Sequence, residues 1–177
     1  MRPRLSSRQK RLDDAHNRGV RLHIWSQKEL ENYFLLVNPI VRAIIRRMPA
    51  RTAKPSAEEI ETALDEICER LKEDVFDAIS AEILGENRAL GSGGANKRAR
   101  EIVAERWQSR EARLATVSGK EAFARLSEWS QHQFGVSLSA AIIAREMSGS
   151  EVQEEMCKVI TAIEYGTEIN SHRDSAK

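Results

Sequence analysis

Only one stretch of this chain has the two-residue alternation of a β-strand, and the other patterned segments have helical spacing. Residues 20–25, VRLHIW, place Val20, Leu22 and Ile24 on one face and polar or aromatic side chains on the other. A single strand cannot form a sheet, because its backbone donors and acceptors stay unpaired on both edges. The sequence therefore predicts a mainly α protein, a bundle of helices with one short N-terminal strand.

The predicted strand needs neighbouring strands, and it leads directly into a helix start. We expect the neighbours to come either from another chain, a second copy in a homodimer included, or from an earlier part of a longer α/β protein. Ser26 and Glu29 have the S-x-x-E spacing of a capping box, which predicts a helix that begins at Gln27. Its first two turns gather two carboxylates, an amide and a phenol: Glu29, Glu31, Asn32 and Tyr33.

Helical spacing continues over the rest of the chain. A second capping box, Ser56 with Glu59, opens a helix that the apolar period extends as one element from Ala57 to Leu84. The glycine-rich residues 85–97 are predicted to form a flexible loop, with a phosphate cradle as the alternative. Further helices are expected at residues 4–19, 96–115, 120–134, 137–147 and 151–166, the third of them opened by a capping box of Ser118 and Glu121.

The charges nearly cancel over the whole chain, but they are unevenly placed. Residues 1–54 carry thirteen basic and four acidic side chains, whereas residues 55–91 carry eleven acidic and three basic ones. A basic first third suggests an anionic partner such as DNA, and the alternative is that the two segments face each other or the solvent.

Cysteine and hydropathy patterns place the chain in the cytoplasm. Cys68 and Cys157 lie far apart at apolar positions of helical patterns, which predicts two reduced core thiols. The longest apolar run, residues 33–48, is interrupted by Asn38, Pro39 and Arg42, too soon to span a bilayer. No membrane partner is therefore expected.

The residues around the predicted strand resemble a known family. GVRLHIWSQKELENYFL, residues 19–35, is similar to the segment that closes the TOPRIM domain of overcoming-lysogenization-defect (OLD) family proteins, the ATP-dependent endonucleases that join an ABC-type ATPase to a C-terminal TOPRIM domain. In that family a strand leads into an rE.ENY motif, and a later GK opens a helix. The matching residues here are Glu29, Glu31, Asn32, Tyr33, Gly119 and Lys120. The first fifty or so residues match well, and residues 113–166 match more loosely.

The resemblance implies a metal-dependent endonuclease that acts on DNA, in defence against mobile elements. It implies that the catalytic residues are Glu31, which contributes to the metal site, and Lys120, which stabilises charge on the scissile phosphate from a helix N-terminus. Mg²⁺ or Mn²⁺ is expected only in a complete TOPRIM domain, because the upstream acidic residue and Asp-x-Asp pair of the family are absent here. Two-metal cleavage needs several carboxylates, so we expect this chain to be inactive without the missing N-terminal ATPase and TOPRIM segment.

The resemblance also suggests a division of the chain. Residues 1–50 would be a partial TOPRIM-like segment, residues 51–166 a helical extension and residues 167–177 a disordered tail. The alternative is a noncatalytic helical module that binds nucleic acid or protein through its basic N-terminal residues and the basic helix within residues 96–110. In the first interpretation the chain is part of an enzyme, and in the second it is a noncatalytic binding module.

Overall fold

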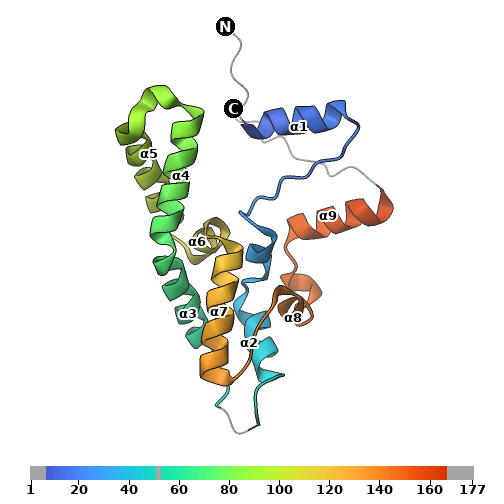
Figure 1. Ribbon diagram of the computed structural model, residues 1–177. Helices are drawn as coiled ribbons and strands as arrows, with labels where there is room; N and C mark the ends of the chain where they lie inside the picture. Colours follow the sequence, from blue (N-terminus) through green and yellow to red (C-terminus); the bar gives the residue numbers. More distant parts are fainter. Residues whose placement is uncertain (1–6, 51–52, 167–177) are drawn as a thin grey trace. The chain divides into compact units, whose positions relative to one another are not determined.

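The computed structural model describes residues 7–50 and 53–166, and its regular elements are all helical (Figure 1). The chain divides into two compact units, one of residues 27–149 and one of residues 1–26 with 150–177. The elements are α1 (Ser7–Asn17), η1 (Leu30–Phe34), α2 (Val37–Ile45), α3 (Ala57–Arg70), α4 (Lys72–Glu86), η2 (Arg88–Leu90), α5 (Gly91–Arg106), α6 (Arg110–Thr116), α7 (Gly119–Phe134), α8 (Ala140–Ala144), η3 (Gly149–Glu151) and α9 (Glu154–Tyr165). The predicted helical bundle is confirmed.

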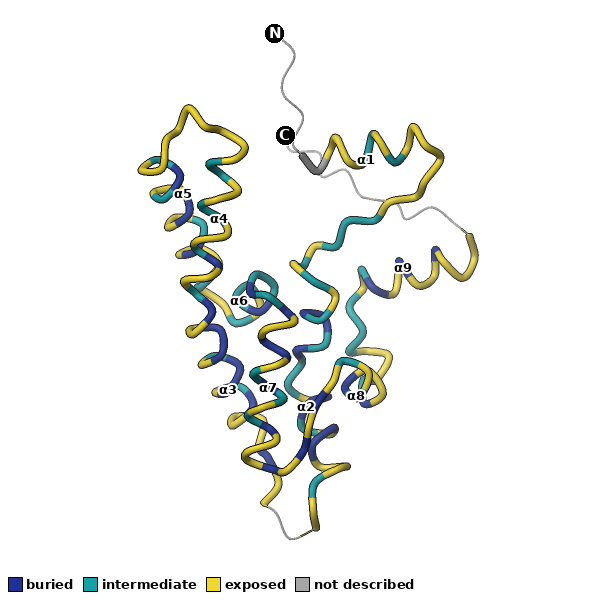
Figure 2. The backbone as a smooth tube through the Cα atoms, in the orientation of Figure 1, coloured by how far each residue is buried: buried dark blue, intermediate teal, exposed yellow. Residues whose placement is uncertain are grey.

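The unit of residues 27–149 has a continuous apolar core, to which α2, α3 and α7 contribute (Figure 2). On α3, Ile60, Leu64 and Ile67 recur every three or four residues and are buried; Ala122 and Leu126 do the same on α7. Burying a leucine or isoleucine side chain contributes about 1.5–3 kcal/mol. This core fixes the short elements that pack around it.

The single helix predicted from Ala57 to Leu84 is interrupted at Leu71, which separates α3 from α4. Leu71 has φ −94° and ψ 0°, and its N–H donates to both Ile67 and Cys68 carbonyls. The bond to Cys68 tightens the turn as in a 3₁₀-helix, and the buried Leu71 side chain anchors the bend in the core. Because a tertiary contact causes the break, no glycine or proline marks it in the sequence.

Helices α4 and α5 lie side by side as a hairpin (Figure 1). The buried alanines Ala95 and Ala99 allow close packing, and Ser80 of α4 donates to Asn96 of α5 at 2.5 Å. The predicted glycine-rich loop is therefore wrong: Gly91, with φ +66°, starts α5, and the glycines after it lie in the first turn. Packing against α4 outweighs the low helix propensity of glycine. The basic segment expected as one helix over residues 96–115 is divided between α5 and α6.

The predicted N-terminal strand is not shown. Residues 20–25 lie in neither a helix nor a strand, and no β-ladder occurs in the described residues that could pair with them. The prediction of a helix that begins at Gln27 is wrong, since the first helical turn after this segment is the 3₁₀-helix η1. Ser26 instead donates its N–H and hydroxyl to Glu155 of α9, whose Oε1 lies 2.9 Å from His23 Nε2.

Several predicted helix ends are confirmed. Ser56 and Ser118 accept hydrogen bonds from the amides three residues ahead, and Gly135 ends α7 with φ +70°. Cys68 is a buried thiol as predicted, but Cys157 is exposed, because it lies on the side of α9 opposite the buried Met156 and Val159. No helix in the described part of the chain is long and apolar enough to cross a membrane. The predicted disordered tail, residues 167–177, lies outside the described residues.

Candidate functional site

Helix α6 ends and helix α7 begins within three residues of each other. The last carbonyl groups of a helix and its first amide groups have no partners within that helix. The α6–α7 junction therefore presents carbonyl oxygens on one side and N–H groups on the other. The segment of residues 28–32 supplies matching groups to both sides.

The carbonyl side of the junction binds donors from this segment. Asn32 Nδ2 donates to Leu114 O at 2.6 Å and to Val117 O at 3.0 Å. The backbone N–H of Lys28 donates to Ala115 O at 3.1 Å. Three carbonyl groups at the C-terminal end of α6 are thus satisfied by residues that are remote in sequence.

The amide side binds a carboxylate. Glu29 Oε2 accepts a hydrogen bond from Lys120 N–H at 2.8 Å, and both Glu29 oxygens lie 3.4 Å from Ser118 Oγ. A negative charge at this position is favoured by the macrodipole of α7. Glu29 therefore caps α7, whereas the sequence suggested that it would cap a helix that begins at Gln27. Glu29 already occupies the Lys120 amide.

The two halves of the proposed family motif contact each other at Asn32 and Gly119. Asn32 is buried, and its Oδ1 accepts from Glu29 N–H at 2.8 Å. A Cβ atom at position 119 would lie 2.6 Å from Asn32 Oδ1 and 2.9 Å from Asn32 N, both closer than real Cβ contacts. Only glycine fits beside Asn32, so the ENY and GK segments are complementary in shape.

Glu31 and Lys120 line the same open hollow, with a volume of about 600 Å³. Glu31 is half-buried and Lys120 is exposed. Their neighbours include a second carboxylate, three serines and an apolar floor: Glu128, Ser127, Ser137, Ser139, Phe123 and Leu138. The two residues for which the resemblance implies a catalytic role thus line one hollow, together with charged and apolar groups.

Tyr33 has a structural role in the segment of residues 27–33. It is buried in the unit, and its hydroxyl accepts from Gln27 N–H at 3.4 Å. Together with the buried Asn32 it fixes the course of residues 27–33. Of the matching motif residues, Glu31 and Lys120 are the ones that line the hollow.

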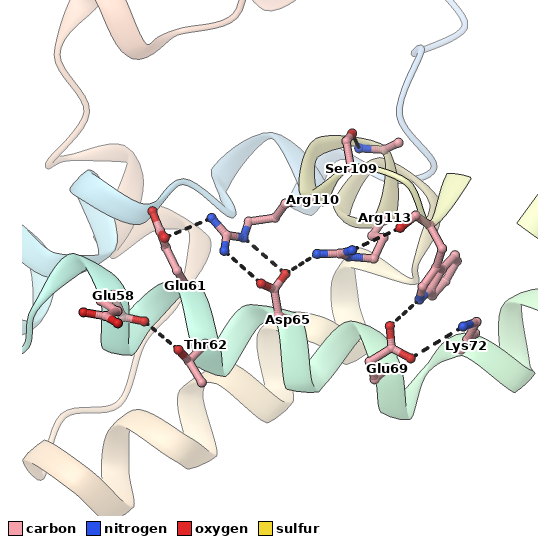
Figure 3. Close-up of polar contacts among 11 residues, drawn as sticks. Glu58, Glu61, Thr62, Asp65, Glu69, Lys72, Ser109, Arg110 and Arg113 are labelled. Atoms are coloured by element: carbon pink, nitrogen blue, oxygen red, sulfur yellow. Dashed lines mark hydrogen bonds and ion pairs between the residues drawn. The ribbon is translucent and has the colours of Figure 1, made fainter. Parts of the chain in front are cut away.

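A group of charged side chains holds α6 against α3 (Figure 3). Asp65 accepts from Arg110 Nη2 at 2.8 Å and from Arg113 Nη2 at 2.6 Å. The hydrogen bond from Arg110 holds the pKa of the Asp65 carboxyl below its usual value. Arg110 also pairs with Glu61 at 3.2 Å. Since the Asn32 hydrogen bonds depend on where α6 ends, these contacts position the junction.

The same group extends along α3 to Trp107, whose Nε1 donates to Glu69 at 2.8 Å, and Lys72 lies 3.6 Å from Glu69. We call this set the α3–α6 brace: Glu61, Asp65, Glu69, Lys72, Arg110 and Arg113. The sequence analysis missed it. The available signal was the spacing of Arg110 and Arg113, which places both on one face of a helix opposite an acidic α3.

The residues present do not form a complete metal site. In the described part of the chain, no three His, Cys, Asp or Glu side chains are grouped so that they could hold an ion. Comparison of the chain with protein families, with curated proteins and with solved structures finds no match.

Proposed function

We propose that this chain supplies the phosphate-binding lysine and one metal ligand of a metal-dependent DNA endonuclease of the OLD type, as the C-terminal part of its TOPRIM domain with a helical extension. One observation carries the proposal. The ENY and GK segments, far apart in the sequence, meet through the Glu29–Lys120 hydrogen bond and the Asn32–Gly119 contact. The segments were paired by resemblance alone, so their contact is independent support.

In this proposal Lys120 is the catalytic cation. Lys120 lines the hollow, where its ammonium group would contact a non-bridging oxygen of the scissile phosphate and stabilise the charge that develops in the transition state. Its backbone amide is held by Glu29, so the α7 N-terminus acts by fixing the lysine stem. The ammonium therefore supplies positive charge without the help of the helix amides.

Glu31 would provide one carboxylate oxygen to a divalent ion. When bound, Mg²⁺ or Mn²⁺ would polarise the attacking water and the phosphate. The other ligands would come from the Asp-x-Asp carboxylates of an upstream TOPRIM segment. Without them, we expect the chain alone to leave supercoiled plasmid intact in either metal.

The coding sequence ahead of the Met1 codon tests the origin of this site. The proposal requires an in-frame Asp-x-Asp preceded by strands and an ATPase domain. Stop codons in that frame, with no separate TOPRIM partner encoded nearby, would contradict it. They would favour the noncatalytic module, for which Lys97 and Arg98 on the exposed side of α5 provide a basic surface.

The chemistry is tested by Lys120→Ala in the chain joined to its upstream segment. We expect cleavage to fall by about a hundredfold or more, as for loss of a group that binds transition-state charge, while DNA affinity changes by less than about tenfold. The matched control is Lys97→Ala, which removes an exposed lysine from α5. If Lys97→Ala weakens binding and Lys120→Ala leaves cleavage unchanged, the binding module is the better account.

A further inference from the structure

Three arginines of α2 and the turn after it converge on one residue beyond α8, Glu146. Arg42 Nε and Nη2 donate to the Glu146 carbonyl at 3.0 and 2.7 Å. Arg46 Nη1 lies 3.3 Å from Glu146 Oε2, and Arg47 Nη1 lies 3.2 Å from Oε1. The Glu146 side chain is only 3% exposed. We call Arg42, Arg46, Arg47 and Glu146 the α2 arginine cluster.

The positive charge of this cluster is not balanced. Arg46 and Arg47 share the single Glu146 carboxylate, which leaves one positive charge in excess between them, while Arg42 donates to the Glu146 carbonyl group. Residues 32–57 contain no Asp or Glu, and the residue before Glu146 is another exposed arginine, Arg145. The buried carboxylate therefore orders the arginines but leaves the surface around them strongly positive.

The guanidinium group of Arg46 is also accessible, and that of Arg47 is partly covered. The Arg46 side chain is 71% exposed and that of Arg47 is 29% exposed, whereas the carboxylate that holds them is buried. An arginine fork that is already fixed loses less conformational entropy when it binds a phosphate, and its planar donors match phosphate oxygens. The cluster has the properties of a preformed phosphate contact.

We infer that the α2 arginine cluster is a binding surface for the backbone of duplex DNA. Neighbouring phosphates in a duplex present several negative charges to one surface, which suits several arginines held side by side. The surface does not depend on the proposed cleavage site, because a chain that binds DNA here and cleaves nothing would satisfy it.

A membrane surface fits these residues less well. Binding to anionic lipid requires an apolar face beside the basic one that inserts below the headgroups. Of the apolar side chains of α2, Ile40, Ala43 and Ile44 are buried in the core, Val37 and Val41 are partly buried against it, and Ile45 is exposed next to Arg46. The cluster therefore offers positive charge with little insertable surface.

The test measures binding of the full chain to a short fluorescent duplex between about 50 and 200 mM salt, where phosphate contacts dominate the salt dependence. Arg46→Gln removes one exposed guanidinium from the cluster. Arg70→Gln is the matched control, because it removes an equally exposed arginine from α3 and changes the net charge by the same amount. Arg46→Lys keeps the positive charge but removes the planar set of guanidinium N–H donors.

We expect Arg46→Gln to lower the salt slope by about 0.9 and the affinity near 0.1 M salt by about fivefold to tenfold, the effect of one lost phosphate contact. Arg70→Gln should bind like the wild type, and Arg46→Lys should retain the wild-type slope. Circular dichroism checks that each variant is folded. Equal losses for Arg46→Gln and Arg70→Gln, no wild-type binding to DNA, or tighter binding to phosphatidylserine vesicles than to the duplex would each overturn the inference.

Discussion

The molecule contains two groups of arginines bound to carboxylates, and they differ in charge balance and exposure. In the α3–α6 brace, three acidic and three basic side chains pair with one another. In the α2 arginine cluster, Arg46 and Arg47 share one carboxylate, and Arg42 donates to the carbonyl group of the same residue. Arg110 and Arg113 of the brace are 30% and 19% exposed, whereas Arg46 of the cluster is 71% exposed and is paired with a carboxylate that is only 3% exposed.

This difference separates a structural role from a binding role. A balanced group with covered cations has little remaining charge to offer a partner, and loss of one member leaves a buried charge without its counterion. An unbalanced group with exposed cations retains charge that a partner can use. The brace positions α6 and the Asn32 hydrogen bonds, and the cluster faces outward.

The largest effect is expected at Cys68, which lies on α3 near the brace. Burial raises the pKa of the Cys68 thiol to about 11, so at pH 8 its thiolate fraction falls by about a hundredfold relative to an ordinary cysteine. Cys157 is exposed. We expect a maleimide or disulfide reagent to modify Cys157 promptly and Cys68 at least about a hundred times more slowly.

The measurement uses Cys157→Ser, which leaves Cys68 as the sole thiol. Rapid modification after addition of urea shows that Cys68 is reactive once the chain unfolds. Native Cys157→Ser could instead be modified as fast as the unfolded chain. That result would mean that the core around Cys68, beside the brace, admits water and reagent, and that the brace is no better covered than the α2 arginine cluster.

Asp65→Ala should destabilise the protein by about 2–3 kcal/mol, since hydrogen bonds to charged groups are lost and covered arginines lose their partner. Arg113 Nε is already buried without a hydrogen-bond partner, so its guanidinium depends strongly on Asp65. Urea unfolding measures the change. The control Glu66→Ala removes the neighbouring carboxylate, which is 63% exposed, and should cost less than about 0.5 kcal/mol.

Glu146→Gln should cost less, about 1 kcal/mol, although Glu146 is more deeply buried than Asp65. The glutamine keeps hydrogen-bonding capacity, and Arg46 can turn fully to the solvent. Because this change also removes the only negative charge of the cluster, affinity for duplex DNA should not fall. A loss of stability as large as that of Asp65→Ala would show that the α2 arginine cluster has a structural role like that of the α3–α6 brace.

The sequence predicted those helix ends that depend on local chemistry. The capping residues Ser56 and Ser118 and the terminal Gly135 are recognised by neighbours within a few residues. The interruption at Leu71 could not be found in this way, because it depends on where the Leu71 side chain packs. Ser26 was misassigned for a similar reason: its spacing to Glu29 fits a capping box, but Glu155 binds it.

The candidate site was predicted only in part. Resemblance selected Glu31 and Lys120, and the structure places both on one hollow. The role of Glu29 as the cap of α7 was not foreseen, because it joins residues that only the tertiary fold brings together. The contribution of Asp65 was missed for the same reason, since it acts through α6.

The smallest effect concerns the pH dependence of the brace. The Arg110 hydrogen bond lowers the pKa of Asp65 in the folded protein below the value of about 3.9 that an unfolded chain has. A carboxyl with a depressed folded pKa stabilises the protein above its unfolded pKa, and this contribution is lost as the pH falls through the folded pKa. We therefore expect the stability difference between wild type and Asp65→Asn to be constant near neutral pH and to shrink below about pH 4.

Urea unfolding of both proteins from neutral pH downward measures this difference. The other carboxyl groups titrate in both, so their effects cancel and the narrowing reports Asp65 alone. The exposed Glu66→Gln, in the same helix, provides the comparison and should show little narrowing. A difference between wild type and Asp65→Asn that stays constant to the lowest pH would mean that the arginines hold Asp65 by shape and not by its charge. The balanced charges of the brace would then be incidental, and the contrast with the α2 arginine cluster would rest on exposure alone.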